Sequence, residues 1–173
     1  MTTEAGAVLE RFETALDGLD VPVTRTGSDE FDRTLRDVVT EPAVGTALSF
    51  ESVSLPAWID DEPTPATLEA ATTGVTAASM GIADYGSVVL PATPEGCEQV
   101  CLFPELHVPV LRASDLVPDM PTAIDRLGPQ LRAGGSAILA TGPSATADMG
   151  ALVKGAHGPR EVHVVVLEEG DDE

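Results

Sequence analysis

Residues 106–111 read LHVPVL, a run of six residues without a charged side chain. Short apolar runs of this kind are typical of strands that are buried on both faces, as in parallel sheets. Similar runs occur at 74–79, 87–90, 136–140 and 162–167. Because segments with helical periodicity separate them, the chain is predicted to be an α/β domain with a mixed, mainly parallel sheet flanked by helices.

Apolar residues recur at helical spacing in 4–19, 29–39 and 121–131, which are predicted to be helices. Ser28 is expected to cap the second of these helices. A fourth helix is expected over 145–154, where alanine, methionine, leucine and lysine follow a glycine-proline turn. Shorter strands are expected at 21–24, 44–50 and 55–59, and a surface loop at 60–67.

The length of 173 residues suits one domain with a sizeable core, so a single domain over 1–173 is predicted, with an acidic tail at 169–173. No run of eighteen apolar residues occurs, and no membrane span is expected. Met1–Glu13 lacks the basic start and continuous apolar stretch of a secretory signal. We therefore expect a cytoplasmic protein.

The composition is strongly acidic, with 29 acidic residues against 9 basic ones and a net charge of −20. Of the nine basic residues, only Lys154 is a lysine. Such a surface repels phosphate backbones, so nucleic acid is not an expected partner. The acids are spread along a chain that is 43% hydrophobic. This pattern is typical of a folded protein from a salt-adapted cell, and we expect the fold to loosen at low salt.

Two cysteines, Cys97 and Cys101, lie four positions apart. Two thiols are too few for a four-cysteine iron–sulfur cluster. A zinc site that recruits His107 is an alternative, but it would lack a fourth ligand and an established spacing. We expect both thiols to be free and partly buried, and we expect no metal and no cofactor in this chain.

The segment 136–158, SAILATGPSATADMGALVKGAHG, is the main candidate for binding chemistry. A strand followed by a turn and a helix N-terminus would offer free backbone N–H groups and a positive dipole end to a small carboxylate or phosphate. The alternative is that Ser144 or Thr146 only caps its own helix. The candidate ligand-binding residues are Gly142, Ser144, Thr146, Asp148 and His157.

Catalytic residues are not identified by any motif, since the chain has no nucleophile elbow, Walker loop or dinucleotide-binding glycine pattern. His157 lies in a glycine-rich loop and is a weak candidate acid or base. Asp84, in the turn of GIADYGSVVL, is the other weak candidate, although a turn aspartate more often bonds its own backbone. His107 and His163 are expected to be structural strand residues.

Three blocks of sequence resemble the LUD domain family, of the lactate utilization protein C type. They are GVTAASMGIADYGSVVL at 74–90, LFPELHVPVL at 102–111 and TGPSATADMGALVKGAHGPREVHVVVLE at 141–168. Their order and spacing match the family over 74–168. The resemblance implies a fold similar to that of sugar-phosphate isomerases and CoA transferases.

The same resemblance implies a role in the oxidation of L-lactate to pyruvate. The expected partners are an iron–sulfur subunit and a cysteine-rich subunit, with the clusters in those partners. This chain would be the accessory subunit without clusters. The chain departs from the family pattern at Tyr85, Ala145 and Gly150, where the family usually has a threonine, a basic or polar residue and a glutamate. Two alternatives stay open: a stand-alone enzyme acting on a phosphorylated or CoA-linked acid, and a metabolite-sensing regulator.

Overall fold

The run 106–111 forms the central strand β6 (Leu106–Arg112) of the main sheet in the computed structural model, which describes residues 4–148 and 150–168. The strand order is β1-β12-β6-β3-β2, and all neighbours are parallel. A short strand, β11, also pairs with β6. The other strands are β1 (Val23–Thr26), β2 (Ala43–Gly45), β3 (Thr73–Ala77), β11 (Glu161–Val162) and β12 (Val164–Leu167).

A second sheet of four strands has the order β7-β4-β5-β8. Its β4–β5 and β5–β8 pairs are antiparallel, whereas β4 and β7 are parallel. Two further strands, β9 and β10, pair only with each other. The bounds are β4 (Met80–Ile82), β5 (Ser87–Pro91), β7 (Leu116–Val117), β8 (Ala137–Thr141), β9 (Ala145–Asp148) and β10 (Ala151–Lys154). The predicted α/β class with a mixed, mainly parallel sheet is confirmed.

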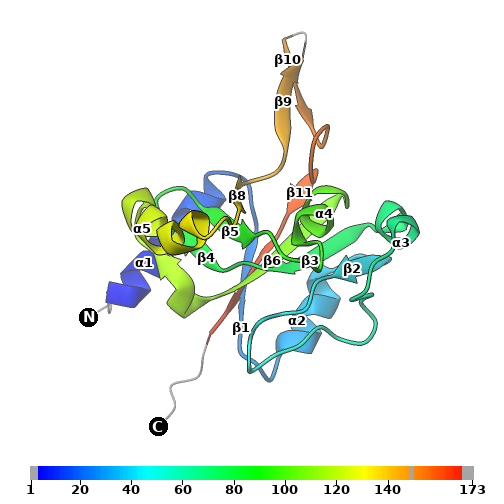
Figure 1. The fold of residues 1–173 in the computed structure, drawn as a ribbon, viewed down its shortest axis with the longest axis horizontal. Coiled ribbons are helices and arrows are strands. Elements are labelled where there is room, and N and C mark those ends of the chain that lie inside the picture. Colours follow the sequence, from blue (N-terminus) through cyan, green and yellow to red (C-terminus); the bar gives the residue numbers. More distant parts are fainter. Residues whose placement is uncertain (1–3, 149, 169–173) are drawn as a thin grey trace.

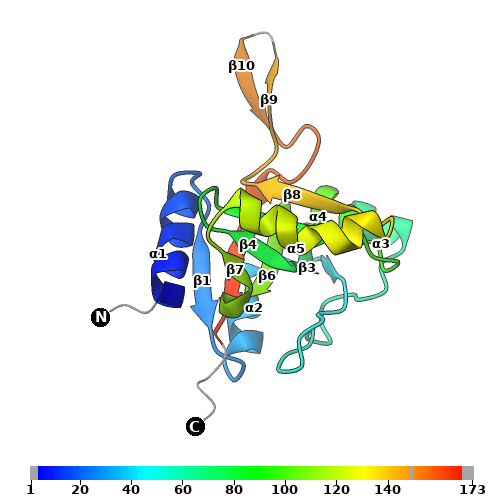
Figure 2. The same ribbon diagram turned by 60° about the vertical axis from the view of Figure 1, so that its left-hand side comes forward.

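Helices cover both sheets, as Figures 1 and 2 show. They are α1 (Glu4–Asp17), α2 (Phe31–Val38), α3 (Pro65–Ala70), α4 (Cys97–Leu102) and α5 (Met120–Arg132), with a 3-10 turn at Ala113–Asp115. The side chains of α2 pack with those of β3, β6 and β12 on one face of the main sheet. On the other face lie α1, α4 and the second sheet. α5 covers the far side of the second sheet.

The alternation of strand side chains accounts for these layers. In β12, Val164 and Val166 face the cluster that contains α1, whereas Val165 and Leu167 face the cluster that contains α2. All four are buried. Burying each such side chain contributes about 1.5–3 kcal/mol relative to leaving it exposed. A strand with apolar residues at every position is therefore stable only between two layers.

A buried polar pair joins β3 to β6. His107 Nε2 and Thr76 Oγ1 lie 2.8 Å apart and are in hydrogen-bond contact. Both side chains are buried, and burial lowers the pKa of His107 to about 3. The imidazole is consequently neutral in the folded protein, and His107 is a structural strand residue.

Gly74 of β3 allows α4 to approach the sheet. A Cβ atom at this position would collide with the carbonyl oxygen of Val100 and would contact the ring of Pro104. Val100 is fully buried in a small cluster with Val44 and Ala71. The glycine is therefore required by the close packing of a helix backbone against a strand.

Several local predictions were wrong. Residues 145–154 form the β9–β10 hairpin rather than a helix. Glu30, not Ser28, occupies the N-cap position of α2, and it makes no side-chain capping bond. The strand predicted at 44–50 ends at Gly45, and no strand forms at 55–59. The loop at 60–67 ends at Thr64, which caps α3. The short helix α4 was not predicted.

Strand β8 also differs from its predicted character. The run 136–140 was expected to be buried on both faces, but β8 is the edge strand of the second sheet and is half-exposed. Among the described residues, no helix has the length and apolar character needed to cross a membrane. The predicted acidic tail at 169–173 lies outside the described residues.

Replacing Gly74 by alanine is expected to destabilise the protein by about 1–3 kcal/mol, because the new methyl group overlaps the α4 backbone. Gly128→Ala, in the interior of α5, is the matched control: its nearest neighbour is the flexible end of Arg132, and alanine gains up to about 1 kcal/mol in a helix. Denaturant unfolding of both variants measures the difference. Equal stabilities would contradict the close α4–β3 packing.

The neutral His107 makes stability depend on pH. Between its folded-state pKa of about 3 and the unfolded value of 6.5, the unfolded chain binds a proton that the folded chain does not. The contribution of His107 to stability is therefore fully present well above pH 6.5 and is progressively lost as the pH falls below that value toward 3. The free energy of unfolding of the wild type should drop relative to that of His107→Gln between pH 6.5 and 5. Parallel pH profiles would refute the buried neutral imidazole.

Candidate functional site

The turn that follows β8 and the loop that follows β10 meet at the base of the hairpin. The backbone N–H of Ser144 donates to the carbonyl oxygen of Pro159 at 2.8 Å, and the N–H of Gly155 donates to that of Ser144 at 2.9 Å. Gly142 has a φ of +64°, which a side chain rarely adopts, and its position allows the sharp turn out of β8. These contacts bring Ser144 and His157 to one cavity.

The cavity has a volume of about 210 Å³ and lies between β8, α4 and the loop after β10. Apolar side chains form most of its wall, and the polar groups belong to a few residues. The lining residues are Leu90, Cys101, Leu102, His107, Ile138, Ala140, Thr141, Gly142, Pro143, Ser144, His157, Gly158, Pro159 and Val162. A small, mostly apolar pocket with convergent polar groups is the usual form of a small-molecule site.

The wall of the cavity is uncharged where it is deepest. Burial raises the pKa of Cys101 to about 12 and that of Cys97 to about 11, so both thiols stay protonated. Protonated thiols are poor nucleophiles and poor metal ligands. The neutral His107 is held by Thr76. Cys101 and His107 therefore line the cavity without carrying charge into it, and Cys97 lies outside its lining.

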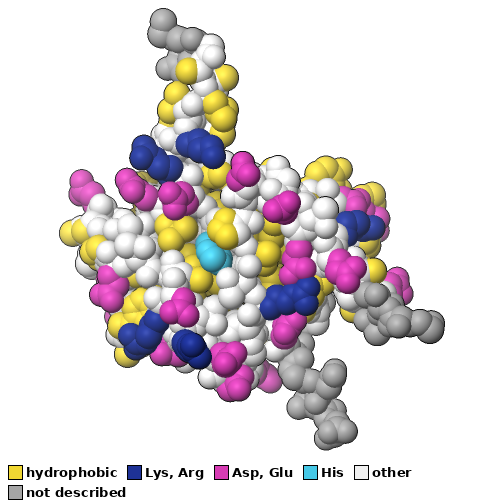
Figure 3. Space-filling view, turned by 180° about the vertical axis from the view of Figure 1, so that it is seen from behind, with side chains coloured by type: hydrophobic (Ala, Val, Ile, Leu, Met, Phe, Trp, Pro, Cys, Tyr) yellow, Lys and Arg dark blue, Asp and Glu magenta, His cyan; other side chains and the backbone are white. Residues whose placement is uncertain are grey.

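Positive charge is available at the rim. A Cβ atom at Gly155 would lie 3.1 Å from Cβ of Arg160, which places this exposed arginine beside the loop that holds His157. Figure 3 shows two Lys or Arg side chains at the foot of the hairpin, on a surface that is otherwise rich in carboxylates. Within the described part of the chain, no ion pair involves Lys154 or Arg160. Lys154 and Arg160 therefore reduce the repulsion that an anion meets at this rim.

The structure brings together three of the predicted site residues, Gly142, Ser144 and His157. The predicted helix N-terminus does not exist, and the N–H of Ser144 is used within the protein. Thr146 and Asp148 belong to strand β9, where they pair with Val153 and Ala151. Anion binding by a helix dipole is therefore excluded for this turn, and the hydroxyl of Ser144, the imidazole of His157 and the nearby guanidinium are the groups available.

Asp84 lies apart from the lining of this cavity. Its Oδ1 atom forms an ion pair with Nε of Arg11 at 3.1 Å, and its backbone N–H donates to Pro118. Its carboxylate is 44% exposed. The Asp84–Arg11 pair links α1 to the turn between β4 and β5, a structural role that the sequence did not predict.

The residues that depart from the family pattern occupy exposed turns or the hairpin. Tyr85 is 51% exposed in the β4–β5 turn. Ala145 is the first residue of β9, and Gly150 has a φ of +79° in the tight turn between β9 and β10. A glycine at that turn avoids the strain that a side chain with positive φ would cause. Among the residues described by the structure, no cluster of three or more potential ligands for a metal ion is present.

Comparisons with known proteins agree with this architecture. The family model described as LUD domain matches residues 4–167. The chain is 29% identical over 111 residues to the lactate utilization protein C of Deinococcus radiodurans. The aligned segment covers 62% of this chain and 52% of that protein. It is 34% identical over 107 residues to the lactate utilization protein C of Bacillus licheniformis, covering 58% and 44%. The chain thus spans about half the length of the curated relatives it matches.

A solved structure has the same fold. The crystal structure of a DUF162 family protein from Deinococcus radiodurans superimposes with a TM-score of 0.72, covering 95% of this chain and 99% of that one, at 19% identity. The match of the family model extends from α1 through β12, which is almost the whole described chain. The chain therefore belongs to the LUD domain family.

Proposed function

We propose that this chain takes part in L-lactate utilization as an accessory subunit of a cytoplasmic lactate-oxidising system and binds a small carboxylate in the cavity at the base of the hairpin. The observation that carries the proposal is that Ser144 and His157 line this cavity while Arg160 lies beside the adjoining loop, in a family with relatives named lactate utilization protein C.

The size of the cavity supports a small ligand. Its volume of about 210 Å³ lies below the range of about 300–1,000 Å³ that is usual for drug-sized molecules. A carboxylate at the rim would accept hydrogen bonds from the Ser144 hydroxyl and a charge-assisted bond from the guanidinium of Arg160. The apolar wall around Leu90 and Ile138 suits the methyl group of lactate or pyruvate.

Among the described residues that line the cavity, none is an activated thiol, which supports an accessory role rather than independent catalysis. The Cys101 thiol at the cavity is protonated, and the buried imidazole of His107 is neutral and in hydrogen-bond contact with Thr76. The exposed His157 is the remaining titratable lining residue that faces solvent. Electron transfer from lactate requires redox centres, which we assign to the iron–sulfur and cysteine-rich partner subunits. The two alternatives are a stand-alone enzyme and a metabolite sensor, and the following experiments distinguish them from an accessory subunit.

Lactate or pyruvate is expected to raise the unfolding temperature of the purified chain in high salt. At one hundred times its dissociation constant, a ligand that binds only the folded state contributes about 2.7 kcal/mol. Ser144→Ala should abolish most of this shift, whereas Ser28→Ala, which removes an exposed hydroxyl far from the cavity, should retain it. A shift with coenzyme A or a sugar phosphate instead would favour an independent enzyme. No shift with any of these ligands would refute the anion site.

Reconstitution tests the role in the assembly. The chain is combined with a candidate cluster-binding protein and a candidate cysteine-rich protein from the same organism, and L-lactate-dependent reduction of a dye is measured. We expect full activity only when all three proteins are present, and about a tenfold or greater loss with Ser144→Ala. An undiminished rate without this chain, or turnover by the isolated chain, would contradict the accessory role.

A further inference from the structure

The β9–β10 hairpin, residues 145–154, projects from the body as an arm (Figures 1 and 2). Among the described residues, no other strand pairs with it. An isolated two-stranded hairpin is only marginally stable in water, because it buries little apolar surface. The described geometry therefore leaves the arm without the cover that such an element usually needs.

One face of the arm is apolar and carries the lysine of the chain. The antiparallel register pairs Ala145 with Lys154 and Ala147 with Leu152. Since directly opposed residues and their second neighbours share a face, these four side chains lie on the same side. Leu152 is 69% exposed. Figure 3 shows hydrophobic side chains along the projecting arm.

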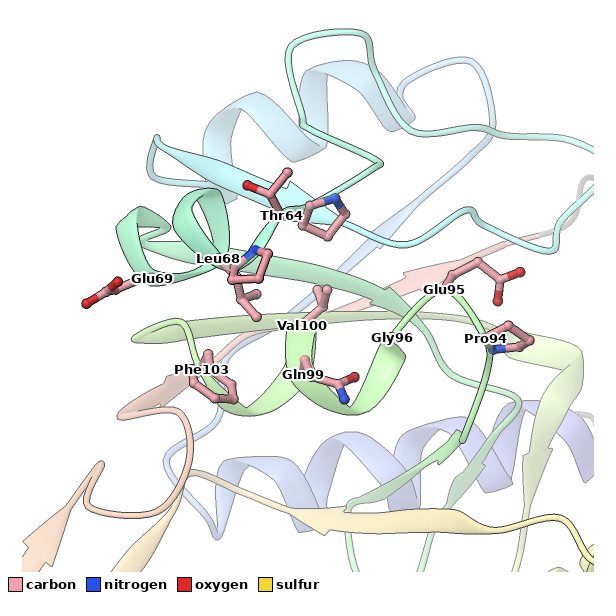
Figure 4. Close-up of a pocket in the computed structure, with 11 residues that line it drawn as sticks. Thr64, Leu68, Glu69, Pro94, Glu95, Gly96, Gln99, Val100 and Phe103 are labelled. Atoms are coloured by element: carbon pink, nitrogen blue, oxygen red, sulfur yellow. The ribbon is translucent and has the colours of Figure 1, made fainter.

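The body has a concave apolar surface of matching character. A groove of about 700 Å³ lies between α3 and α4, with Leu68 and Val100 at its floor and Phe103, 69% exposed, at one end (Figure 4). Glu69 and Glu95 line its two ends. An exposed aromatic beside such a groove is typical of a surface that another protein covers.

The charges of the arm and of the groove favour a second copy of this chain as the partner that binds there. The net charge of the chain is −20, so most of its surface repels a second copy. The segment 145–160 is less acidic than most of the chain, with Lys154 and Arg160 against one acid, Asp148. An apolar arm with cations at its foot complements an apolar groove with carboxylates at its ends. Because every copy carries both surfaces, one reciprocal contact uses both arms and both grooves and closes as a symmetric pair.

We propose that two copies of this chain form a dimer in which the arm of each copy, residues 145–154, lies in the α3–α4 groove of the other, with Leu152 beside Phe103 and Lys154 near a groove carboxylate. This inference goes beyond the proposed function and does not depend on which anion the cavity binds. Because the arm begins directly after Ser144, binding of the arm to the groove of the other copy would also hold the base of the cavity in place.

The test is the mass of the full chain in molar salt, measured by light scattering and by sedimentation over a range of concentrations. The wild type is expected to be a dimer. Leu152→Ser and Phe103→Ser should each weaken it by about thirty-fold or more, as for truncated interface anchors. Leu131→Ser, which alters an apolar side chain of α5 that is 43% exposed and outside both surfaces, should leave the dimer intact.

Mixing the two variants gives the sharpest readout. Leu152→Ser retains an intact groove, and Phe103→Ser retains an intact arm. In an equimolar mixture the intact arm can bind the intact groove, which restores one of the two contacts. The mixture should therefore dimerise more tightly than either variant alone. Unfolding temperatures near that of the wild type confirm that the exposed substitutions leave the fold unchanged. A monomeric wild type, a polymer larger than two copies, or variants and mixtures without effect would each overturn the proposal.

Discussion

The buried polar pair, the position of α4 and the two surfaces beside α4 all depend on the parallel pairing of β3 with β6. It sets Thr76 against His107 in the interior, and it places Gly74 where the backbone of α4 lies directly against the sheet. α4 in turn supplies Cys101 and Leu102 to the cavity at the base of the hairpin and Val100 and Phe103 to the groove on its other side. A short helix that is held this closely links the two surfaces.

The buried strands could be predicted because their apolar, β-branched residues have a local signature. Val164–Leu167 and Leu106–Arg112 follow it, and the periodicity of Glu4–Asp17 and Met120–Arg132 gives the two long helices. The helix at Cys97–Leu102 spans less than two turns, which is too short for a periodic signal. The division into two sheets depends on strand order, which involves residues far apart in the sequence.

The hairpin shows how long-range contacts override local preference. ATADMGALVK contains good helix formers after a serine, and it was predicted as a helix on that ground. In the structure, Ser144 bonds to Gly155 and Pro159, so the chain must return beside itself, and Gly150 provides the turn. This return is also why Gly142 and Ser144, which precede β9, line the same cavity as His157, which follows β10. The Asp84–Arg11 contact joins residues more than seventy positions apart and had no local signal.

The order of strands in the main sheet has a consequence for biosynthesis. β1 is an edge strand whose neighbour in the sheet is β12, with Val23 opposite Val164. A ribosome makes β1 early and β12 late, at about 5–20 residues per second. Until β12 emerges, β1 lacks its neighbour, and the apolar side of α1, with Phe12 and Leu16, lacks Val164 and Val166. The nascent chain therefore leaves β1 unpaired and the apolar face of α1 partly uncovered for much of its synthesis.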